Sequence, residues 1–210
     1  MGCLTQRYRE ELTTELPEID IMLGKFDWGN FIDSLPDLKD TAKPKQWERE
    51  LTTPPHSAYL KISEGCNRFC AFCAIPLITG RHTSRTIEEI LEETESLVAK
   101  GVKEFNVIAQ DLSSYGIDIY GSHKLAELID RMAGIKGVEW IRLHYAYPAD
   151  FPFDILDVMA RHENVCKYID IALQHVSDKV LNNMRRHITK EETISLIAEM
   201  RKRVPDIRIR

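Results

Sequence analysis

The chain has 210 residues, of which 43% are hydrophobic and 29% are charged, with a net charge of −5. This balance excludes a protein held on nucleic acid by its overall charge, and no apolar run approaches the about 18 residues that span a bilayer. The five cysteines are an odd set with three of them clustered, unlike the even set of a secreted disulfide scaffold. We therefore expect a soluble enzyme in the reducing cytoplasm.

The first 56 residues contain too little apolar material to form a domain of their own. Residues 1–35 hold short helical turns and one apolar segment, LPEIDIMLGKFDW. Residues 36–56 contain four prolines among charged side chains, which is the composition of a linker. We expect 1–35 to be the C-terminal remnant of an N-terminal domain, 36–56 to be a linker, and 57–210 to be the main, incomplete domain.

Strand and helix patterns alternate from residue 57 onward. AYLKIS alternates apolar and polar residues as a strand does, and TIEEILEETESLVAK places its apolar residues on one helical face. Thr86 and Glu89 have the spacing of a capping box at the start of that helix, and Gly101 stands where a glycine would end it. VKEFNVIA, VEWIRLHY and YIDIALQ are the next predicted strands, each followed by helical segments.

This alternation decides the predicted fold class. Strands that alternate with helices of about 10–15 residues predict βαβ units and a parallel sheet. Four such units are followed by a fifth strand, DIRIR, at which the chain ends. The sequence therefore predicts an α/β fold, a partial (β/α) barrel truncated after about four βα units. Because a strand without a following helix is an unusual terminus, we also expect the chain to be a piece of a longer protein.

Three cysteines dominate the first strand-to-helix loop. The stretch EGCNRFCAFCAIP places Cys66, Cys70 and Cys73 within eight residues. In parallel α/β folds, chemistry takes place in the loops at the carboxyl ends of the strands, so this loop is a candidate site. Cysteines in tight loops commonly hold iron–sulfur clusters. Three thiolates would leave one iron of a cubane cluster open to a substrate or cofactor.

Two other interpretations of these cysteines remain open. A structural zinc ion requires a fourth ligand, and none of the remaining candidates has the usual spacing: His82, Cys166 and Cys3. Free cysteines are also often simply buried in a core. A non-catalytic zinc-binding module is therefore kept as an alternative from a different functional class.

The cysteine motif resembles a known signature. The spacing C-x3-C-x2-C, with Phe72 before the last cysteine, is similar to that of radical S-adenosylmethionine (SAM) enzymes. AYLKISEGCNRFCAFCAIPLITGRHTSR, GVKEFNVIAQDLSSYG, WIRLHYAYP and IDIALQHVSDKVLNNMRR resemble the methylthiotransferases of that superfamily over residues 55–190. The resemblance implies a partial (β/α) barrel in which Cys66, Cys70 and Cys73 hold a 4Fe–4S cluster whose open iron binds SAM, beside Phe72.

The resemblance also implies a reaction and its partners. LHYAYP is similar to the branch that replaces a C–H by C–SCH3 on the β-carbon of an aspartate in a small-subunit ribosomal protein. That chemistry uses an electron donor such as flavodoxin or ferredoxin, a 5′-deoxyadenosyl radical and a second SAM as methyl donor. The alternative is the sister branch, which modifies an adenosine of tRNA. Nucleic acid is an expected partner only in that alternative, and no membrane is expected in either.

Cys3 has a separate implied role. GCLTQRYREEL resembles the end of the family's N-terminal domain, which carries three cysteines for an auxiliary cluster. Cys3 would be the last of the three, and the other two are expected upstream of residue 1. The resemblance thus implies two 4Fe–4S clusters in the full-length enzyme and one in this chain. We expect the isolated chain to be inactive in methylthiolation.

Polar residues at other predicted strand ends are further candidates. Gln110 and Asp111 follow the second strand and are expected to contact SAM or substrate, although Asp111 could instead cap a helix. Gln174 and His175 follow the fourth strand and are the candidate catalytic residues. The alternative for His175 is a structural role.

Arginines near the cysteine loop complete the set. Arg81 and Arg85 flank the loop before the first helix, where they are candidates for the SAM carboxylate or for a solvated surface. Arg185 and Arg186 follow LNNM, and the sequence leaves open whether they face the site or the solvent.

Overall fold

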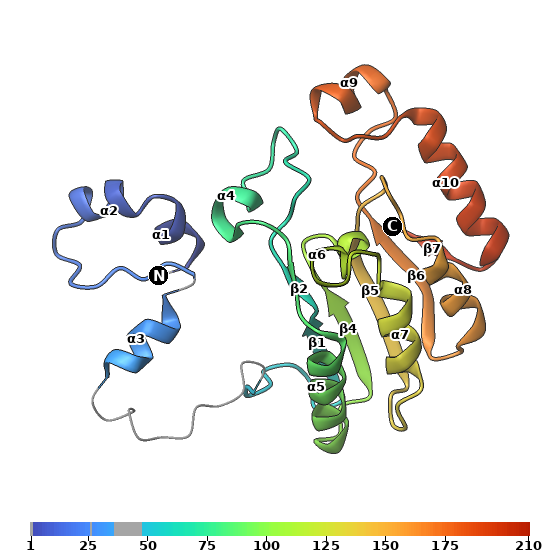
Figure 1. Ribbon diagram of the computed structural model, residues 1–210, viewed down its shortest axis with the longest axis horizontal. Helices are drawn as coiled ribbons and strands as arrows, with labels where there is room; N and C mark the ends of the chain where they lie inside the picture. Colours follow the sequence, from blue (N-terminus) through green and yellow to red (C-terminus); the bar gives the residue numbers. More distant parts are fainter. Residues whose placement is uncertain (1, 26, 36–47) are drawn as a thin grey trace.

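Five parallel strands form the central sheet of the computed structural model, which describes residues 2–25, 27–35 and 48–210. The strands are β1 (Ser57–Lys61), β4 (Glu104–Ile108), β5 (Trp140–Ala146), β6 (Val165–Ile171) and β7 (Arg208–Ile209). Their spatial order, β1-β4-β5-β6-β7, is also their order along the chain (Figure 1). Each crossover therefore joins neighbouring strands, as in an opened (β/α) barrel. The predicted parallel sheet, with four βα units and a fifth strand, is confirmed.

The two faces of the sheet differ in their burial. Leu60, Val107, Leu143 and Ile169 are paired in register across four strands, and none is more than 1% exposed. The residues that alternate with them lie on the opposite face, where Tyr59 is 55% exposed. The first face carries the hydrophobic core, and the second face remains open to the polar groups of the site.

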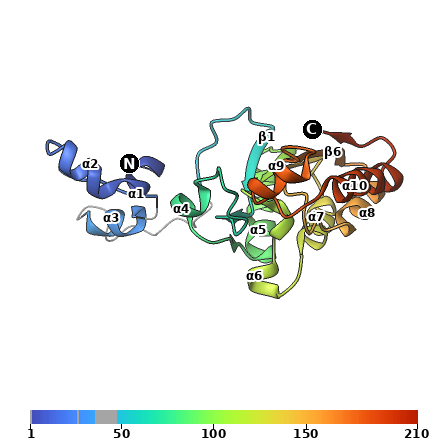
Figure 2. The same ribbon diagram turned by 90° about the horizontal axis from the view of Figure 1, so that it is seen from above.

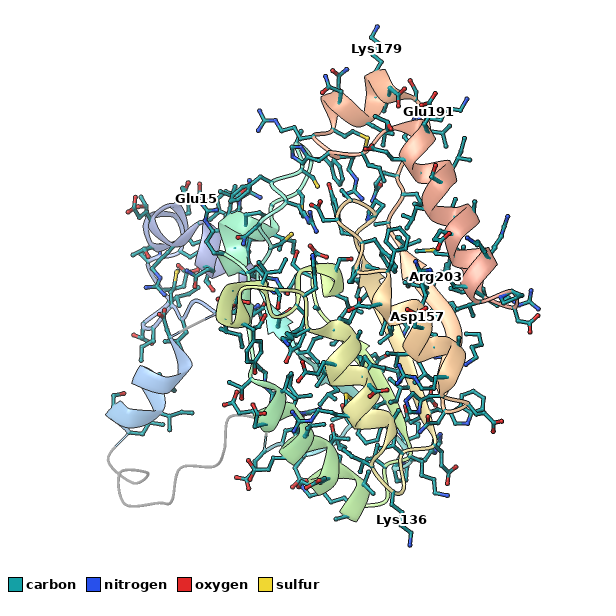
Figure 3. All side chains as sticks on the ribbon, turned by 45° about the vertical axis from the view of Figure 1, so that its right-hand side comes forward. Glu15, Lys136, Asp157, Lys179, Glu191 and Arg203 are labelled. Atoms are coloured by element: carbon teal, nitrogen blue, oxygen red, sulfur yellow. The ribbon has the colours of Figure 1, made fainter. Side chains whose placement is uncertain are left out.

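Helices cover the buried face. They are α5 (Ile87–Ala99), α7 (Leu125–Ala133), α8 (Asp154–Arg161) and α10 (Lys190–Arg203). Successive helices of this layer contact one another and lie on the same side of the strands (Figures 1 and 2). Arg203 of α10 and Asp157 of α8 point toward each other, with Nη1 3.4 Å from Oδ2 (Figure 3). This exposed ion pair marks the α8–α10 contact.

The predicted ends of α5 are confirmed. The Thr86 hydroxyl accepts a hydrogen bond from the Glu89 N–H, and the Glu89 carboxylate accepts one from the Thr86 N–H, which completes the capping box. At the other end Gly101 has a φ of +97°, the left-handed conformation that favours glycine after a helix. Local sequence signals therefore fix both ends of this helix.

Short elements cluster at the carboxyl edge of the sheet. They are the antiparallel pair β2 (Ser63–Glu64) and β3 (Thr83–Ser84), together with α4 (Ile75–Thr79), η2 (Leu112–Ser114), α6 (Ile117–Tyr120) and α9 (Asp178–Asn183). Figure 1 shows α4 and α9 beyond the upper ends of the strands. The long βα loops thus lie where an active site is expected.

The N-terminal segment contains α1 (Cys3–Arg7), α2 (Arg9–Glu15) and α3 (Trp28–Ser34), and α1 contacts α4. Residues 36–47 of the predicted linker lie outside the described residues, and 48–56 contain neither helix nor strand. The expected domain boundaries at 35 and 56 stay predictions. Among the described helices, none combines the length and the apolar character needed to cross a membrane.

Candidate active site at the carboxyl edge of the sheet

The loop that carries the three cysteines begins at Gly65. This glycine has a φ of +78°, and a Cβ built on it would lie 2.1 Å from the carbonyl oxygen of Arg81. Only glycine permits so close an approach of two backbone segments in this conformation. The approach lets the Cys66 N–H donate a hydrogen bond of 3.3 Å to the Gly80 carbonyl. Gly65 therefore fixes the start of the cysteine loop against the segment that follows α4.

The three thiols line one cavity with a volume of about 500 Å³. Cys70 is buried, while Cys66 and Cys73 are partly exposed. Burial raises the pKa of the Cys66 thiol, and this is opposed by the Arg68 N–H, which lies 3.5 Å from Cys66 Sγ. The structure thus places the three predicted ligands on the lining of one cavity.

Three other predicted residues line the same cavity: Phe72, Gln110 and Gln174. Gln110 donates a hydrogen bond of 2.6 Å to Glu64, and its own amide oxygen is buried with no partner among the described residues. Gln174 is exposed and lies just beyond β6. Gln110 therefore presents a fixed acceptor that a bound ligand can satisfy.

Arg186 enters this cavity from the loop after α9. Its side chain is buried, and Nη1 donates to Cys70 Sγ at 3.2 Å, while Nη2 donates to the carbonyl of Ala172. The guanidinium carbon lies 4.2 Å from the ring centroid of Tyr147, whose hydroxyl donates back to the Arg186 carbonyl at 2.6 Å. The question left open by the sequence is answered: Arg186 faces the site, and Arg185 is exposed.

A second arginine beside the cysteines is neutralised. Arg68 Nε donates a hydrogen bond of 2.8 Å to the buried carboxylate of Asp111, and Nη1 donates one of 3.0 Å to the exposed Asp150. Asp111 also accepts from the Ser113 N–H at 2.9 Å and so caps η2. Asp111 is not among the residues that line the cavity. Capping, the alternative offered for this residue, is its observed role, and a contact with SAM stays a prediction.

The remaining predicted residues have their described contacts elsewhere. The Arg81 guanidinium packs 4.9 Å from the ring centroid of Phe69, and Arg85 donates to Glu93 at 2.6 Å. His175 is exposed and accepts a hydrogen bond from Ser177 N–H at 2.9 Å. None of the three predicted residues lines the cavity of the cysteines. Their predicted roles at SAM or in catalysis stay predictions.

Cys3 begins α1, the helix that contacts α4. Its thiol interacts electrostatically with Lys25 and Lys61, and both ammonium groups pair with the carboxylate of Glu64. Lys61 also lines the cavity. Sequence reasoning missed Lys61, although its alternation with Tyr59 along β1 indicates the open face of the sheet.

Backbone strain is concentrated at this edge of the sheet. Six non-glycine residues of the described chain have positive φ: Phe69, Tyr145, Asp150, Gln174, Arg185 and His187. All six lie at or beyond the carboxyl ends of strands. Tyr145 lies where a register shift interrupts the β5–β6 pairing, and it lines the cavity. Such strain gathers at functional sites, where the surrounding structure stabilises it.

The residues at the cavity fit an iron–sulfur cluster better than a single ion. Three thiols supply the ligand type of such clusters, and the buried Arg186 offers positive charge beside Cys70. Zinc requires four ligands at about 2.0–2.3 Å. Of the three candidates for a fourth ligand, Cys3, His82 and Cys166, none is among the residues that line the cavity. The alternative of a zinc-binding module gains no support.

Comparison with known sequences identifies similar proteins. The model of the radical SAM superfamily matches residues 60–209. The chain is 58% identical over 211 residues to ribosomal protein uS12 methylthiotransferase RimO of Phocaeicola vulgatus, covering 100% of this chain and 48% of that protein. The protein of the same name from Porphyromonas gingivalis is 57% identical over 210 residues, with the same coverage. The chain spans about half the length of the curated relatives it matches.

Solved structures of similar fold are radical SAM enzymes. The methyltransferase TsrM from Kitasatospora setae, solved with tryptophan and a SAM analogue, has a TM-score of 0.57 at 20% identity. The match covers 74% of this chain and 32% of that one. The cobalamin-dependent enzyme OxsB with aqua-cobalamin and SAM has a TM-score of 0.57 at 16% identity, covering 72% and 23%. These likenesses bear on the fold alone.

Proposed function

Because the chain belongs to the radical SAM superfamily, we propose that Cys66, Cys70 and Cys73 hold a 4Fe–4S cluster and that the cavity beside them binds SAM. The observation that carries this proposal is the placement of all three thiols on one cavity of about 500 Å³ at the carboxyl edge of a parallel sheet. Thiolate ligation is how proteins hold such clusters, and three ligands leave one iron for SAM.

The cluster and SAM, when bound, supply the reductive radical chemistry that attacks an unactivated C–H bond. The residues of this chain bind the cluster and SAM and orient them in the cavity. Gln110, held by Glu64, offers its buried amide oxygen to a donor group of the ligand. Phe72 and Tyr145 supply aromatic surface to the cavity wall. The remaining predicted contacts to SAM, at Arg81, Arg85 and Asp111, are less favoured by their described partners.

We further propose that the longer protein is a methylthiotransferase of ribosomal protein uS12, which converts a C–H of an aspartate β-carbon to C–SCH3. The support is the 58% identity, over the whole of this chain, to relatives that carry this name. The net charge of −5 gives no support to the tRNA alternative. Cys3 belongs to an auxiliary cluster in this proposal, and the helix that it begins, α1, contacts α4 of the cysteine loop.

The proposal includes the surroundings of the enzyme. A ribosomal protein as substrate places the enzyme in the cytoplasm, and the reduction requires a low-potential donor such as flavodoxin or ferredoxin. The relative roles of Gln174 and His175 in catalysis also belong to the proposal, and the cavity-lining Gln174 is the better candidate.

Metal and sulfide analysis of the full-length protein tests the cluster. After anaerobic reconstitution we expect each of Cys66→Ala, Cys70→Ala and Cys73→Ala to lose the iron and sulfide of one cluster. Cys166→Ala is the matched control, because Cys166 lies on β6 and is not among the cavity-lining residues. One zinc with neither iron nor sulfide in the unsubstituted protein would contradict the proposal.

Incubation with both substrates tests the reaction. The full-length enzyme, with SAM and a reductant, is expected to add about 46 Da to uS12, the mass difference between SCH3 and H, and nothing to tRNA. Modified tRNA with unmodified uS12 would favour the sister activity instead.

A further inference from the structure

A second cavity, of about 530 Å³, adjoins the cavity of the cysteines. It lies along β1, the outermost strand of the described sheet, and its lining includes Tyr59, Lys61, Ser63, Arg85 and Ile108. We call it the edge cavity. Lys61 and Ile108 also line the cavity of the cysteines, so the two cavities meet at this pair of residues. A ligand that extends through both cavities therefore passes the ammonium group of Lys61.

The wall of the edge cavity contains polar groups whose hydrogen bonds are incomplete. Ser63 is 2% exposed, and its hydroxyl has no partner among the described residues. Arg85 uses Nη1 for the Lys61 carbonyl and for Glu93, while its buried Nη2 has no partner within the described part of the chain. Because buried polar groups are normally hydrogen-bonded, these two residues indicate a site completed by a ligand that carries acceptor atoms.

Lys61 retains the capacity to donate to such a ligand. Its ammonium group pairs with Glu64, whose carboxylate also pairs with Lys25 and accepts a hydrogen bond of 2.6 Å from Gln110. One carboxylate is thus divided among three donor side chains. An ammonium group carries three N–H donors, which is more than the contact with Glu64 uses. Lys61 can therefore bind a further acceptor without giving up its contact with Glu64.

The other two cations that line the cavity of the cysteines are less accessible. The side chain of Arg68 is 13% exposed and is neutralised by Asp111 and Asp150. Arg186 is buried, with its donors directed to Cys70 and to the carbonyl of Ala172. The side chain of Lys61, by contrast, is 43% exposed. Lys61 is therefore the cation that an incoming anionic group reaches first.

The proposed reaction requires a partner for an anionic group close to the reacting atom. In an aspartate side chain the β-carbon is bonded directly to the carboxylate carbon, so an enzyme that attacks the C–H bond must also accommodate the charge. A carboxylate that leaves water without a cation or hydrogen-bond donors beside it carries a large desolvation cost. A flexible ammonium group at the junction of the two cavities supplies both the charge and the donors.

We propose that Lys61 is a substrate-binding residue that holds the side-chain carboxylate of the target aspartate, while the residues next to that aspartate occupy the edge cavity. This inference rests on the proposed function and names the group that recognises its substrate. The ion pair fixes the β-carbon beside the cavity of the cysteines and distinguishes aspartate from the nearly isosteric but neutral asparagine.

A comparison of two substrates tests the inference with the full-length, reconstituted enzyme. The substrates are uS12 and a uS12 variant in which asparagine replaces the target aspartate, and kcat/KM for the gain of SCH3 is measured for each by mass spectrometry. We expect the unsubstituted enzyme to prefer aspartate by about 10–100-fold, the worth of a hydrogen bond to a charged group. Lys61→Met should bring this ratio close to one, chiefly by slowing the reaction of aspartate. Lys61→Arg, which keeps the charge, should retain a preference for aspartate.

Lys25 provides the matched control, because it pairs with the same carboxylate but is not among the residues that line either cavity. Lys25→Met is expected to keep the ratio of the unsubstituted enzyme. A Lys61→Met enzyme with full iron and an unchanged ratio overturns the inference.

The SAM carboxylate is the other source of the same chemistry, and equilibrium dialysis with SAM distinguishes the two. A Lys61→Met enzyme that binds SAM more weakly but keeps its preference for aspartate would assign Lys61 to SAM and overturn the inference. If the Lys61 variants do not fold, the unsubstituted enzyme decides, since equal kcat/KM for the two substrates also overturns it. Failure of the unsubstituted enzyme to modify uS12 at all would contradict the proposed function instead.

Discussion

The guanidinium group of Arg85 donates a hydrogen bond of 2.6 Å to the carboxylate of Glu93, which is completely buried on α5. A second nitrogen contact comes from Arg49, which pairs with the other carboxylate oxygen. Arg85 also donates to the carbonyl of Lys61 at 2.9 Å, so the pair links β1 to the helix that covers it. These contacts favour a structural role for Arg85 over the cofactor contact predicted for it.

Replacement of Glu93 should therefore destabilise the fold strongly. Glu93→Gln leaves Arg85 and Arg49 without their shared carboxylate, and we expect the free energy of unfolding to fall by about 3–5 kcal/mol. Urea denaturation measures the loss. Glu95→Gln on the exposed side of the same helix is the control, with an expected change within about 0.5 kcal/mol. A loss of similar size in both variants would contradict the pairing.

Gly65 and Gly80 have nearly the same φ but differ in the room that each leaves for a Cβ atom. Their φ values are +78° and +77°, but only at Gly65 would a Cβ collide with backbone, whereas at Gly80 nothing lies within 4 Å. We expect Gly80→Ala to lose about 1–3 kcal/mol through strain alone. Gly65→Ala should lose more and should also displace the cysteine loop. Thermal unfolding measures the loss of stability, and iron content measures the displacement of the cysteine loop. Equal losses of stability in the two variants would contradict a steric clash between the new Cβ and the backbone at Gly65.

Arg68, whose side chain is 13% exposed, allows two carboxylate partners of different burial to be compared. Arg68 pairs with Asp111, whose side chain is 2% exposed, and with Asp150, whose side chain is 75% exposed. Asp111→Asn should lower the free energy of unfolding by about 3–5 kcal/mol, because it leaves a largely buried guanidinium poorly compensated. Asp150→Asn should cost less than about 1 kcal/mol. Chemical denaturation of both variants checks the order, and a reversed order would contradict it.

The environment of Lys61 predicts that the free energy of unfolding depends on pH. Burial and the neighbouring ammonium of Lys25 lower the pKa of Lys61 from 10.5 to about 8. Between pH 8 and pH 10.5 the unfolded chain binds more protons than the folded one. Lys61 therefore lowers the free energy of unfolding below pH 8, and this destabilisation disappears as the pH rises from 8 to 10.5. Relative to Lys61→Met, the wild-type protein should gain stability between pH 7.5 and about 10.

Lys25 controls the position of that window. Lys25→Met removes the neighbouring positive charge, so the pKa of Lys61 should rise and the gain should begin at higher pH. Unfolding free energies of the single and double variants across the pH range measure the shift. A difference between wild type and Lys61→Met that does not change with pH would contradict the lowered pKa.

Most of the fold was predictable because its signals are local. The period of apolar residues identified the strands and helices around the sheet, and the capping box of Thr86 and Glu89 fixed the start of α5. The cysteine loop was also predictable, since Cys66, Cys70 and Cys73 are close in sequence and follow the first strand. The contacts between distant side chains were harder to predict from the sequence. Arg85 and Arg186 are both arginines in polar loops, and nothing local distinguishes the one that turns to Glu93 from the one that turns to Cys70.

The sequence by itself therefore determined the order of the elements, the parallel sheet and the three thiols at its carboxyl edge, because periodicity and short spacing act within a few residues. Only the tertiary structure decided which charges meet the thiols. Arg186 is separated from Cys70 by 116 positions, and the two come within 3.2 Å because β6 and the loop after α9 return to the same edge as β1. Contacts across such separations depend on how the strands are ordered and packed, which local propensity does not specify.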